Sequence, residues 1–325
     1  MRLLVTGGAG FIGSNFIRFM LRRYSDIEII NLDKLTYCGN LENLMDIAGE
    51  ERYSFVKGDI CDKEIVEKLI HKTDAVINFA AETHVDRSIK YPDDFLRTNV
   101  FGVKNLLDAA RKSNINRFVQ ISTDEVYGSV SKGFSKEEDA LKPNSPYSAA
   151  KAAGDLLALS YYTTYGLPVS VVRSSNNFGP FQYPEKVMPL FITNLLREQK
   201  VPLYGDGGNI REWLFVEDNL AAIDLILNKG RVGEVYNVGG ENRVTNFELT
   251  KKLLSAMNKN ETFIEYVNDR PGHDRRYALD SSKIKALGWN GPKNFEIRLM
   301  ETVKWYEDNK TWWNALKETA HIVKW

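Results

Sequence analysis

The sequence predicts an α/β protein in which a doubly wound parallel sheet is joined to a smaller C-terminal lobe. Over roughly the first half, compact apolar runs typical of strands alternate with amphipathic stretches of helical period. The apolar runs contain few polar positions, as expected of parallel strands that helices cover on both faces. After about Asn176 the chain becomes rich in glycine, proline and aromatic residues, which indicates a smaller lobe that closes over a ligand.

The strands and helices of the main sheet can be placed from these runs. We expect strands at 2–7, 28–33, 53–59, 75–81, 117–123 and 168–176, with a returning strand at 233–240. We expect helices at 11–24, 63–72, 98–113, 147–166 and 216–229. The predicted domains are therefore a main domain, residues 1–175 with 212–238 returning to it, and a substrate-binding lobe, residues 176–211 and 239–325.

Composition argues against several classes of partner. The 325 residues carry 43 basic and 43 acidic side chains, and a chain without net charge is not expected to bind nucleic acid. Cys38 and Cys61 are too few for a disulfide framework, and the four histidines are scattered, so we expect no metal site. No apolar run approaches the roughly 18 residues of a membrane span, and the N-terminus leads straight into a strand. We expect a soluble cytoplasmic protein without a membrane partner.

The stretch VTGGAGFIG places Gly7, Gly10 and Gly13 between the first strand and the first helix. Glycine at such a turn lets the backbone approach a pyrophosphate, which then lies at the positively polarised N-terminus of the helix. The spacing Gly-x-x-Gly-x-x-Gly differs from the Gly-x-Gly-x-x-Gly of most dinucleotide-binding folds, and a glycine cluster alone is also compatible with a simple tight turn. Its place between strand and helix favours a Rossmann-type dinucleotide site.

Residues at the ends of the following strands support a dinucleotide. Asp33 ends the second predicted strand, twenty residues after Gly13. A carboxylate there accepts hydrogen bonds from the adenosine ribose and repels a 2′-phosphate, which favours NAD over NADP, although the neighbouring Lys34 weakens this preference. Segments 58–60 and 79–84 end the next two strands, where such sheets bind ligands.

A tyrosine four residues before a lysine can act as a general base, because the lysine ammonium stabilises the phenolate and a helix places both on one face. The sequence contains three such pairs: Tyr53/Lys57, Tyr147/Lys151 and Tyr306/Lys310. Three matches show that the pattern means little without its context.

Context argues against two of the pairs. Tyr53 and Lys57 fall in a predicted strand, where they would lie more than about 12 Å apart at roughly 3.3 Å per residue. Tyr306 and Lys310 fall in the charged stretch KWYEDNK, which we interpret as the solvated end of a helix.

Tyr147 and Lys151 instead begin a long helix, with Ser145 as the expected N-cap and Pro146 at the first helical position. This helix starts some twenty residues after the STDEVYG stretch, so a short excursion can return it to the carboxyl edge of the sheet. A purely structural role for the pair is the alternative.

In STDEVYG, residues 122–128, two acids stand side by side directly after a predicted core strand. In one interpretation Ser122, Thr123 and Asp124 merely form a turn or a helix N-cap, and Glu125 faces water. Open α/β sheets bind ligands at the carboxyl ends of their strands, however. That position favours a pair with separated pKa values, in which one carboxyl group is protonated and the other ionised.

Together these motifs resemble the extended short-chain dehydrogenase/reductase family over essentially the whole chain. The motifs that carry the resemblance are TGGAGFIGSNF, STDEVYG, PYSAAKA, RSSNNFGPFQYPEKVMP, YGDGGNIREW and DRPGHDRRYA. Within the family, the pair Asp124-Glu125 is similar to that of the dTDP-glucose 4,6-dehydratases. Epimerase relatives have no acid pair there, and decarboxylase and GDP-mannose dehydratase relatives typically keep only the glutamate.

The resemblance implies a redox-neutral elimination of water from a sugar nucleotide. Tyr147, held as a phenolate by Lys151, would take the C4 hydroxyl proton while hydride moves to NAD, and Thr123 would orient that hydroxyl. Glu125 would take the C5 proton and Asp124 would protonate the departing C6 hydroxyl, before hydride returns to C6. The product would be a 4-keto-6-deoxy sugar nucleotide, and NAD regenerated in place would stay tightly bound.

The resemblance also implies the lining of both binding sites. Residues matched to the NAD site are Gly7, Gly10, Phe11, Ile12, Gly13, Asp33, Lys34, Leu35, Thr36, Asp59, Ile60, Ala80, Ala81, Thr98, Tyr147, Lys151 and Asn176. Residues matched to the substrate site are His84, Thr123, Asn177, Lys186, Val187, Met188, Pro189, Pro202, Tyr204, Arg211, Asn246, Arg270 and His273. It further implies a homodimer, in which helices from 93–113 and 147–166 form a four-helix interface, and a deoxysugar pathway such as that of rhamnose.

Alternatives stay open at this point. One is a UDP-sugar 4,6-dehydratase or epimerase of the same family, since one methyl group on the base discriminates by only about 1–3 kcal/mol. Another, of a different class, is a catalytically silent protein that senses NAD. The chain is somewhat short for the family, and its C-terminal stretch TWWNALKETAHIVKW carries no motif that assigns it a role.

Overall fold

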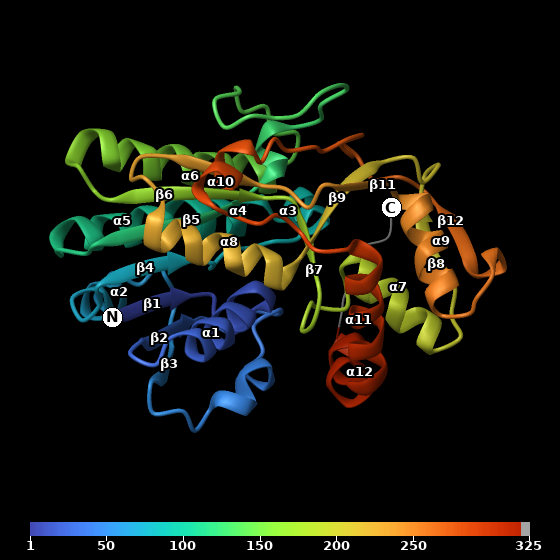
Figure 1. Ribbon diagram of the computed structural model, residues 1–325, viewed down its shortest axis with the longest axis horizontal. Coiled ribbons are helices and arrows are strands. Elements are labelled where there is room, and N and C mark those ends of the chain that lie inside the picture. The colour runs from blue at the N-terminus through green and yellow to red at the C-terminus, as the bar shows by residue number, and fades with distance from the viewer. Residues whose placement is uncertain (320–325) are drawn as a thin grey trace.

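The computed structural model describes residues 1–319 and is built on a seven-stranded sheet with a smaller lobe beside it (Figure 1). The strand order is β10-β6-β5-β4-β1-β2-β3, and every neighbouring pair is parallel. The strands are β1 (Arg2–Thr6), β2 (Glu28–Asp33), β3 (Tyr53–Lys57), β4 (Ala75–Asn78), β5 (Arg117–Thr123), β6 (Val169–Ser174) and β10 (Val235–Val238). The doubly wound sheet is confirmed, and its order reverses between β1 and β4, where open α/β sheets bind ligands.

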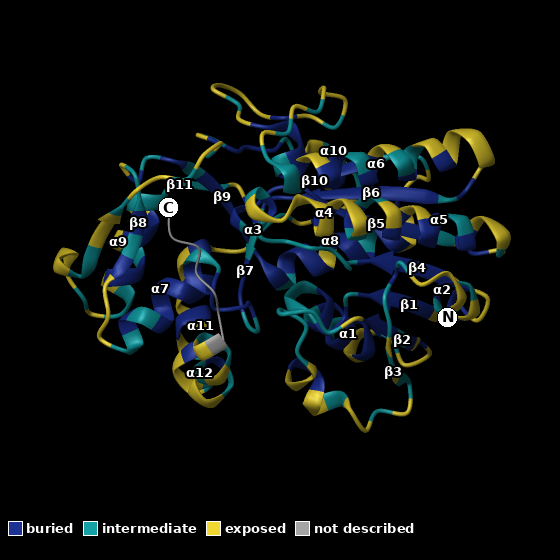
Figure 2. Ribbon diagram, turned by 180° about the vertical axis from the view of Figure 1, so that it is seen from behind, coloured by how far each residue is buried: buried dark blue, intermediate teal, exposed yellow. Residues whose placement is uncertain are grey.

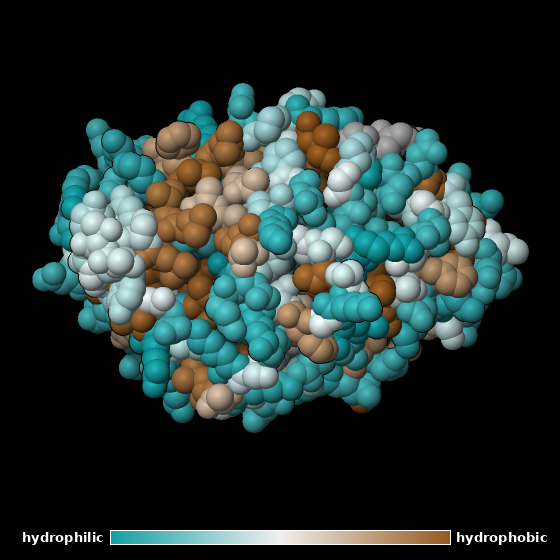
Figure 3. All heavy atoms as spheres, turned by 90° about the horizontal axis from the view of Figure 1, so that it is seen from above, coloured by the Kyte–Doolittle hydropathy of each residue, from teal (hydrophilic) through white to brown (hydrophobic). Residues whose placement is uncertain are grey.

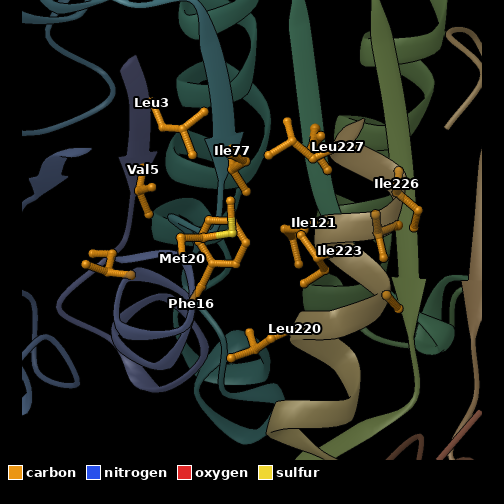
Figure 4. Packing of buried hydrophobic residues seen from close by; sticks show 14 of the residues in the cluster. Leu3, Val5, Phe16, Met20, Ile77, Ile121, Leu220, Ile223, Ile226 and Leu227 are labelled. Carbon is orange, nitrogen blue, oxygen red and sulfur yellow. The ribbon is translucent and has the colours of Figure 1, made fainter. Parts of the chain in front are cut away.

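Helices cover both faces of this sheet, as the apolar strands require. Helices α1 (Phe11–Arg23) and α8 (Val216–Lys229) pack together on one face, where Phe16 and Met20 join Ile223 in a single buried cluster (Figure 4). The other face is covered by α2 (Lys63–Ile70), α5 (Val103–Lys112) and α6 (Pro146–Tyr165). Figure 2 shows the consequence, with buried strands inside and exposed residues on the outer sides of the helices.

Strand β1 shows why the strands are apolar at nearly every position. Leu3 and Val5 belong to the cluster beneath α1 and α8, whereas Leu4 belongs to the cluster on the opposite face. Successive side chains of a strand point to opposite faces, so a sheet covered on both sides needs apolar residues at odd and even positions alike.

The connection from β4 to β5 is almost entirely helical. It consists of α3 (Val85–Lys90), α4 (Pro92–Leu96), the π-helical segment η2 (Arg97–Gly102) and α5. The helix predicted at 98–113 is therefore present, but its first turn is π-helical and continues directly from α4.

The smaller lobe contains a three-stranded sheet, β11-β9-β7, and a two-stranded sheet, β12-β8. Its strands are β7 (Asn176–Phe178), β8 (Val201–Tyr204), β9 (Ile210–Phe215), β11 (Asn242–Thr245) and β12 (Ile264–Val267). Its helices are α7 (Val187–Leu196), α9 (Asn246–Ala256), α11 (Phe295–Asp308) and α12 (Lys310–Thr319). The short 3₁₀ helices of the chain are η1 (Leu41–Ile47), η3 (Asp124–Tyr127) and η4 (Glu261–Phe263).

One late segment does not pack with this lobe. Helix α10 (Ser282–Leu287) lies against α8 and β10, and both Ile284 and Trp289 join the core of the main sheet. The division of the chain into two domains stays a prediction.

Helix α11 corrects one interpretation of the sequence. Tyr306 is fully buried rather than solvated, and its hydroxyl donates a hydrogen bond of 2.5 Å to the carbonyl of Gln182. The charges of KWYEDNK lie on the other face of the helix, where Lys304 pairs with Asp308 at 2.7 Å. Residues three and four apart share a helix face, so one stretch can be both strongly charged and anchored in a core. Residues 320–325 of the C-terminal stretch lie outside the described part of the chain.

The ion pair of Arg173 with Asp155, at 2.9 Å, is completely buried and should be essential for stability. We expect Asp155→Asn to lower the free energy of unfolding by about 3–5 kcal/mol, because it leaves the Arg173 guanidinium buried without a counter-charge. Urea denaturation would measure this. The exposed pair Arg2–Glu28 is the control, since Glu28→Gln should cost less than about 1 kcal/mol. Equal effects of the two substitutions would contradict the prediction.

Candidate active site

The glycine loop joins β1 to α1, and two of its glycines are required by packing. Gly7 has a φ of 69°, and a Cβ on it would lie 2.6 Å from the backbone nitrogen of Ala80. A Cβ on Gly13 would lie 2.4 Å from the Gly7 carbonyl oxygen. Gly10, the N-cap of α1, would meet nothing closer than 3.3 Å, so its missing side chain leaves open space at the helix N-terminus. This cradle fits the pyrophosphate of a dinucleotide.

A cavity of about 290 Å³ opens over the glycine loop. Among the residues matched to a cofactor, those that line it are Gly7, Gly10, Phe11, Ile12, Gly13, Asp33, Lys34, Thr36, Asp59, Ile60, Ala80, Ala81, Thr98, Tyr147, Lys151 and Asn176. Leu35 does not line it. Its backbone is left-handed, with a φ of 58°, and its N–H donates to the Asp33 carboxylate at 2.8 Å, so it turns the chain there instead.

Asp33 lines the cavity and also holds the glycine loop by a hydrogen bond. Its second carboxylate oxygen accepts a hydrogen bond of 2.9 Å from the N–H of Ala9. Burial raises the pKa of Asp33, and the two backbone hydrogen bonds oppose that rise. The ammonium of Lys34 pairs with Asp59 at 2.8 Å. Lys34 is therefore engaged by a carboxylate, which weakens the case for a 2′-phosphate partner.

Helix α6 presents Tyr147 and Lys151 to the same cavity. It begins as expected, with Ser145 as N-cap in a capping box with Ser148 and with Pro146 in the first turn. Lys151 is buried, its ammonium donates to the Ile121 carbonyl at 2.6 Å, and burial lowers its pKa to about 8.

The pKa of the Tyr147 phenol is raised, first by burial and then by the carboxylates of Glu125 and Asp124. Hydrogen bonding with Thr123 acts in the opposite direction. Tyr147 thus lies within the electrostatic reach of both acids. The other two tyrosine–lysine pairs are not at this site: Tyr53/Lys57 spans β3, and Tyr306 is in the core of the smaller lobe.

The acid pair follows β5 in a single 3₁₀ turn, η3. The Thr123 hydroxyl accepts from the Glu125 N–H at 3.2 Å and donates to the Asp124 carboxylate at 3.2 Å. The structural interpretation was therefore right about the cap. Asp124 is nevertheless only 2% exposed, and Glu125 is half-buried and lines the cavity.

The two carboxyl groups have different surroundings. Burial raises the pKa of Asp124 well above its usual range, Glu125 and Glu212 raise it further, and one of its oxygens has no hydrogen-bond partner in the described structure. Burial also raises the pKa of Glu125, but Arg270, Arg211 and Lys186 all oppose this rise.

A proton shared by the pair therefore favours Asp124, and the negative charge favours Glu125. Such a division is what an acid and a base acting on one substrate require.

A second cavity of about 730 Å³ lies between the acid pair and the smaller lobe, and the two cavities share Thr83, Glu125, Asn176, Glu185 and Lys186. Among the residues matched to a substrate, those that line it are His84, Lys186, Val187, Pro202, Tyr204, Arg211, Asn246, Arg270 and His273. Thr123 and Asn177 line the first cavity instead. Glu125 thus stands where the two cavities meet, whereas Asp124 beside it lines neither of them.

Met188 and Pro189 are not brought to either cavity. Met188 is fully buried in the hydrophobic core of the smaller lobe, and Pro189 is buried beside it in α7. The matched KVMP stretch begins a helix, so only Lys186 and Val187 face the site while the next residues turn inward.

Two residues that the sequence did not single out hold the cations in place. Asp86 accepts from the Arg270 guanidinium at 2.7 Å, and Arg211 lies over the ring of Tyr277 at 4.3 Å. Tyr277 belongs to the DRPGHDRRYA motif, but neither that motif nor the sequence around Asp86 indicates which arginine each residue contacts, because the fold alone brings them together. Burial and the neighbouring cations lower the pKa of His84 to about 3.

Burial, Arg270 and Arg211 likewise lower the pKa of His273, to about 4. Among residues 1–319 no group of histidine, cysteine and acidic side chains could hold a metal ion. Nor does that part of the chain contain a helix that is long and apolar enough to cross a membrane.

The model of the GDP-mannose 4,6-dehydratase family matches residues 4–302. The chain belongs to this family. Among its relatives, a dTDP-glucose 4,6-dehydratase of Streptomyces niveus is 52% identical over 322 residues, which are 98% of this chain and 96% of that protein. The low-salt glycan biosynthesis protein Agl12 of Haloferax volcanii is 51% identical over 306 residues, 94% of this chain and 98% of that protein.

Solved structures of the family share the fold. A dTDP-glucose 4,6-dehydratase from Streptomyces venezuelae with NAD bound has a TM-score of 0.95 and 48% identity, covering 97% of this chain and all of that one. A UDP-glucose 4-epimerase from Thermus thermophilus in complex with NAD has a TM-score of 0.88 and 32% identity, covering 95% of this chain. The resemblance and the Rossmann-type fold class inferred from the sequence are confirmed.

Lys151 should control the alkaline side of the pH profile. We expect the turnover rate to fall as the pH rises through about 8, because the ammonium loses the charge that supports a Tyr147 phenolate. Lys151→Arg keeps a permanent charge, so its alkaline limb should shift upward although its maximal rate is lower. Steady-state rates across the pH range would test this, and coincident alkaline limbs in the two proteins would contradict it.

Proposed function

We propose that this protein is an NAD-dependent dTDP-glucose 4,6-dehydratase, a lyase that forms dTDP-4-keto-6-deoxyglucose and water. The observation that carries the proposal is the adjacent pair Asp124-Glu125. Asp124 is buried, and Glu125 lines the smaller cavity together with Tyr147 and the larger cavity as well. Relatives named as dTDP-glucose 4,6-dehydratases are 52%, 51% and 50% identical to the chain over nearly its full length.

The glycine loop and Asp33 would hold NAD in the smaller of the two cavities. NAD bound there supplies a hydride acceptor for C4 of the sugar and a hydride donor for C6, so the sequence of steps needs no external oxidant. Gly10 leaves room for the pyrophosphate, and Asp33 keeps lone pairs for the adenosine ribose beside its two backbone hydrogen bonds.

Oxidation at C4 needs a base for the hydroxyl proton. Tyr147 is the base, since it lines the cavity, and Lys151 one turn later on α6 supplies the positive charge. Thr123 orients the same hydroxyl. The charge of Lys151 matters more here than in water, because the Tyr147 side chain is half-buried and two carboxyl groups raise the pKa of its phenol.

The acid pair then carries the elimination. A ketone at C4 acidifies the C5 proton, which Glu125 takes as the ionised member of the pair. Asp124 gives its proton to the C6 hydroxyl, which leaves as water and produces a C5–C6 double bond. After C6 has been reduced, Glu125 returns its proton to C5 and a 4-keto-6-deoxy sugar remains.

The substrate's diphosphate carries charge that the larger cavity can neutralise. Arg211 and Arg270 line it and are fixed by Tyr277 and Asp86, so their guanidinium groups are pre-oriented. A cytoplasmic location is consistent with the two free cysteines, Cys38 and Cys61, and stays a prediction, as does the deoxysugar, rhamnose or another, made from the product.

The proposal predicts that purified protein removes one water from dTDP-glucose without added reductant. Mass spectrometry of dTDP-glucose and UDP-glucose after incubation would measure it, because elimination lowers the mass by one water while epimerisation leaves it unchanged. Equal loss from both substrates would show a broader sugar-nucleotide dehydratase. No mass change in either, with NAD bound, would contradict the proposal and favour an epimerase or a silent NAD-binding protein.

Two variants serve as controls for this experiment. Glu125→Gln should abolish loss of water while still permitting oxidation at C4, seen as a rise in NADH absorbance when substrate is added. Tyr147→Phe should suppress the absorbance change as well, because no base takes the C4 hydroxyl proton. Normal turnover by Tyr147→Phe would show that the base is another residue.

We also propose that the protein is a homodimer through a four-helix interface formed by α4, η2, α5 and α6. The proposal is supported by large apolar side chains left exposed there, including Leu96, Phe101 and Leu156, the last two 63% and 58% exposed. Figure 3 shows brown apolar atoms gathered on the face that is seen from above, along which α6 lies in Figure 1. A patch of this kind is uncommon on a monomer.

We expect Leu156→Arg to produce monomers, because a charged side chain at the centre of an apolar interface has no counter-charge. Light scattering coupled to gel filtration would report the mass of wild type and variant. Ile297→Arg is the matched control: Ile297 is 60% exposed on α11, away from the proposed interface, and its substitution should leave the dimer intact. A monomeric wild type would contradict the proposal.

A further inference from the structure

The C-terminal helix α12 reaches the glycine loop through one buried amide. The indole N–H of Trp312 donates to Oδ1 of Asn43 at 2.9 Å, and Nδ2 of Asn43 donates to the carbonyl of Ala9 at 2.9 Å. Asn43 is 2% exposed, so its hydrogen bonds are made with protein and not with solvent. A residue near the end of the chain is thereby joined, through a single side chain, to the loop that precedes α1.

The peptide groups around Ala9 are held from two sides by this arrangement. The N–H of Ala9 donates to Asp33, and its carbonyl accepts from the backbone N–H of Asn40 at 3.0 Å as well as from Asn43. The next residue is Gly10, the N-cap of α1. The peptide between Ala9 and Gly10 is thus held at its carbonyl and also at its N–H, which donates to the Gly7 carbonyl at 3.2 Å. This peptide leads into α1, so the hydrogen bond from Asn43 helps to set the direction of the N–H groups that the first turn offers to a pyrophosphate.

An aromatic cluster packs α12 against Phe181, which in turn contacts α1. Phe181 lies 4.7 Å from Trp305 and 5.8 Å from Trp312, ring centre to ring centre, and the guanidinium of Arg18 lies 4.3 Å from the centre of the Phe181 ring. Arg18 belongs to α1 and pairs with Asp46 of η1 at 2.7 Å. Gln182 and Tyr183, which follow Phe181, line the cavity over the glycine loop, so the cluster lies next to one part of the lining of that cavity.

We propose that Trp312 and Asn43 are positioning residues that slow the release of NAD. They act through the Ala9 carbonyl and not by touching the cofactor. The inference rests on the NAD site of the proposed function, but not on the identity of the sugar nucleotide. A reaction that regenerates its NAD within each turnover is favoured when the NAD stays bound. The hydrogen bonds from Trp312 through Asn43 to Ala9 would serve this retention.

The test is the rate at which the holoenzyme exchanges its NAD for isotopically labelled NAD. Trp312→Phe keeps the aromatic packing and removes one hydrogen bond, so we expect release to be about threefold to tenfold faster. The turnover rate at saturating NAD should be unchanged, and added NAD should restore activity to dilute enzyme. If Trp312 only stabilised the fold, its substitution would lower the melting temperature, and added NAD would not restore the activity.

Trp313→Phe is the matched control. Its indole N–H donates a hydrogen bond of 2.7 Å to the Tyr306 carbonyl, within the smaller lobe, so its loss should leave NAD release unchanged. Asn43→Asp is the second variant, since its carboxylate can still accept from Trp312 but repels the Ala9 carbonyl, and release should again accelerate.

Wild-type release rates in both Trp312→Phe and Asn43→Asp would overturn the inference, and so would equal acceleration in Trp313→Phe. Wild-type protein that binds no NAD at all would overturn the proposed function instead.

Discussion

Two adjacent carboxyl groups at the end of β5, the buried Asp124 and the half-buried Glu125, determine the arrangement of charges around them. A buried carboxylate is costly unless cations or hydrogen bonds compensate for its lost hydration. The compensation for Glu125 comes from Arg211, Arg270 and Lys186, all of which belong to segments of the smaller lobe. The charge state on which the chemistry depends is therefore assembled by both parts of the chain, and neither part alone could sustain it.

The turn after β5 can serve as a helix cap and as an acid–base pair at the same time. Thr123 caps η3 and at the same time lies between Asp124 and the cavity. The cap fixes the backbone, and the two acids meet different charges: Glu212 and one arginine act on Asp124, whereas three cations act on Glu125. An ordinary capped turn can therefore act as an acid–base pair, because different charges surround its two carboxyl groups.

Patterns in the sequence predict those features that depend on neighbours along the chain. The strands, the glycine loop, Asp33 and the start of α6 at Ser145 follow from apolar periodicity and capping, which are local. Asp86, Tyr277 and Trp312 escaped notice because their partners, Arg270, Arg211 and Asn43, lie far away in sequence.

The prediction that Tyr306 is solvated was wrong for a related reason. Charged residues on one face of a helix do not indicate whether the opposite face is buried. Met188 and Pro189 match the family motif but do not line the site. The motif continues into α7, and the helix directs these two residues into the core of the smaller lobe.

The seventh strand of the main sheet has a consequence for biosynthesis. Strand β10 pairs with β6, yet the residues between them form much of the smaller lobe. During translation the first 175 residues emerge with the edge of β6 unpaired, and an open strand edge is prone to pair with another chain. The sheet is completed only after residue 238 has left the ribosome, by which time β7, β8 and β9 are also available. The nascent chain is thus most vulnerable to aggregation over this interval, and the two lobes mature together rather than one after the other.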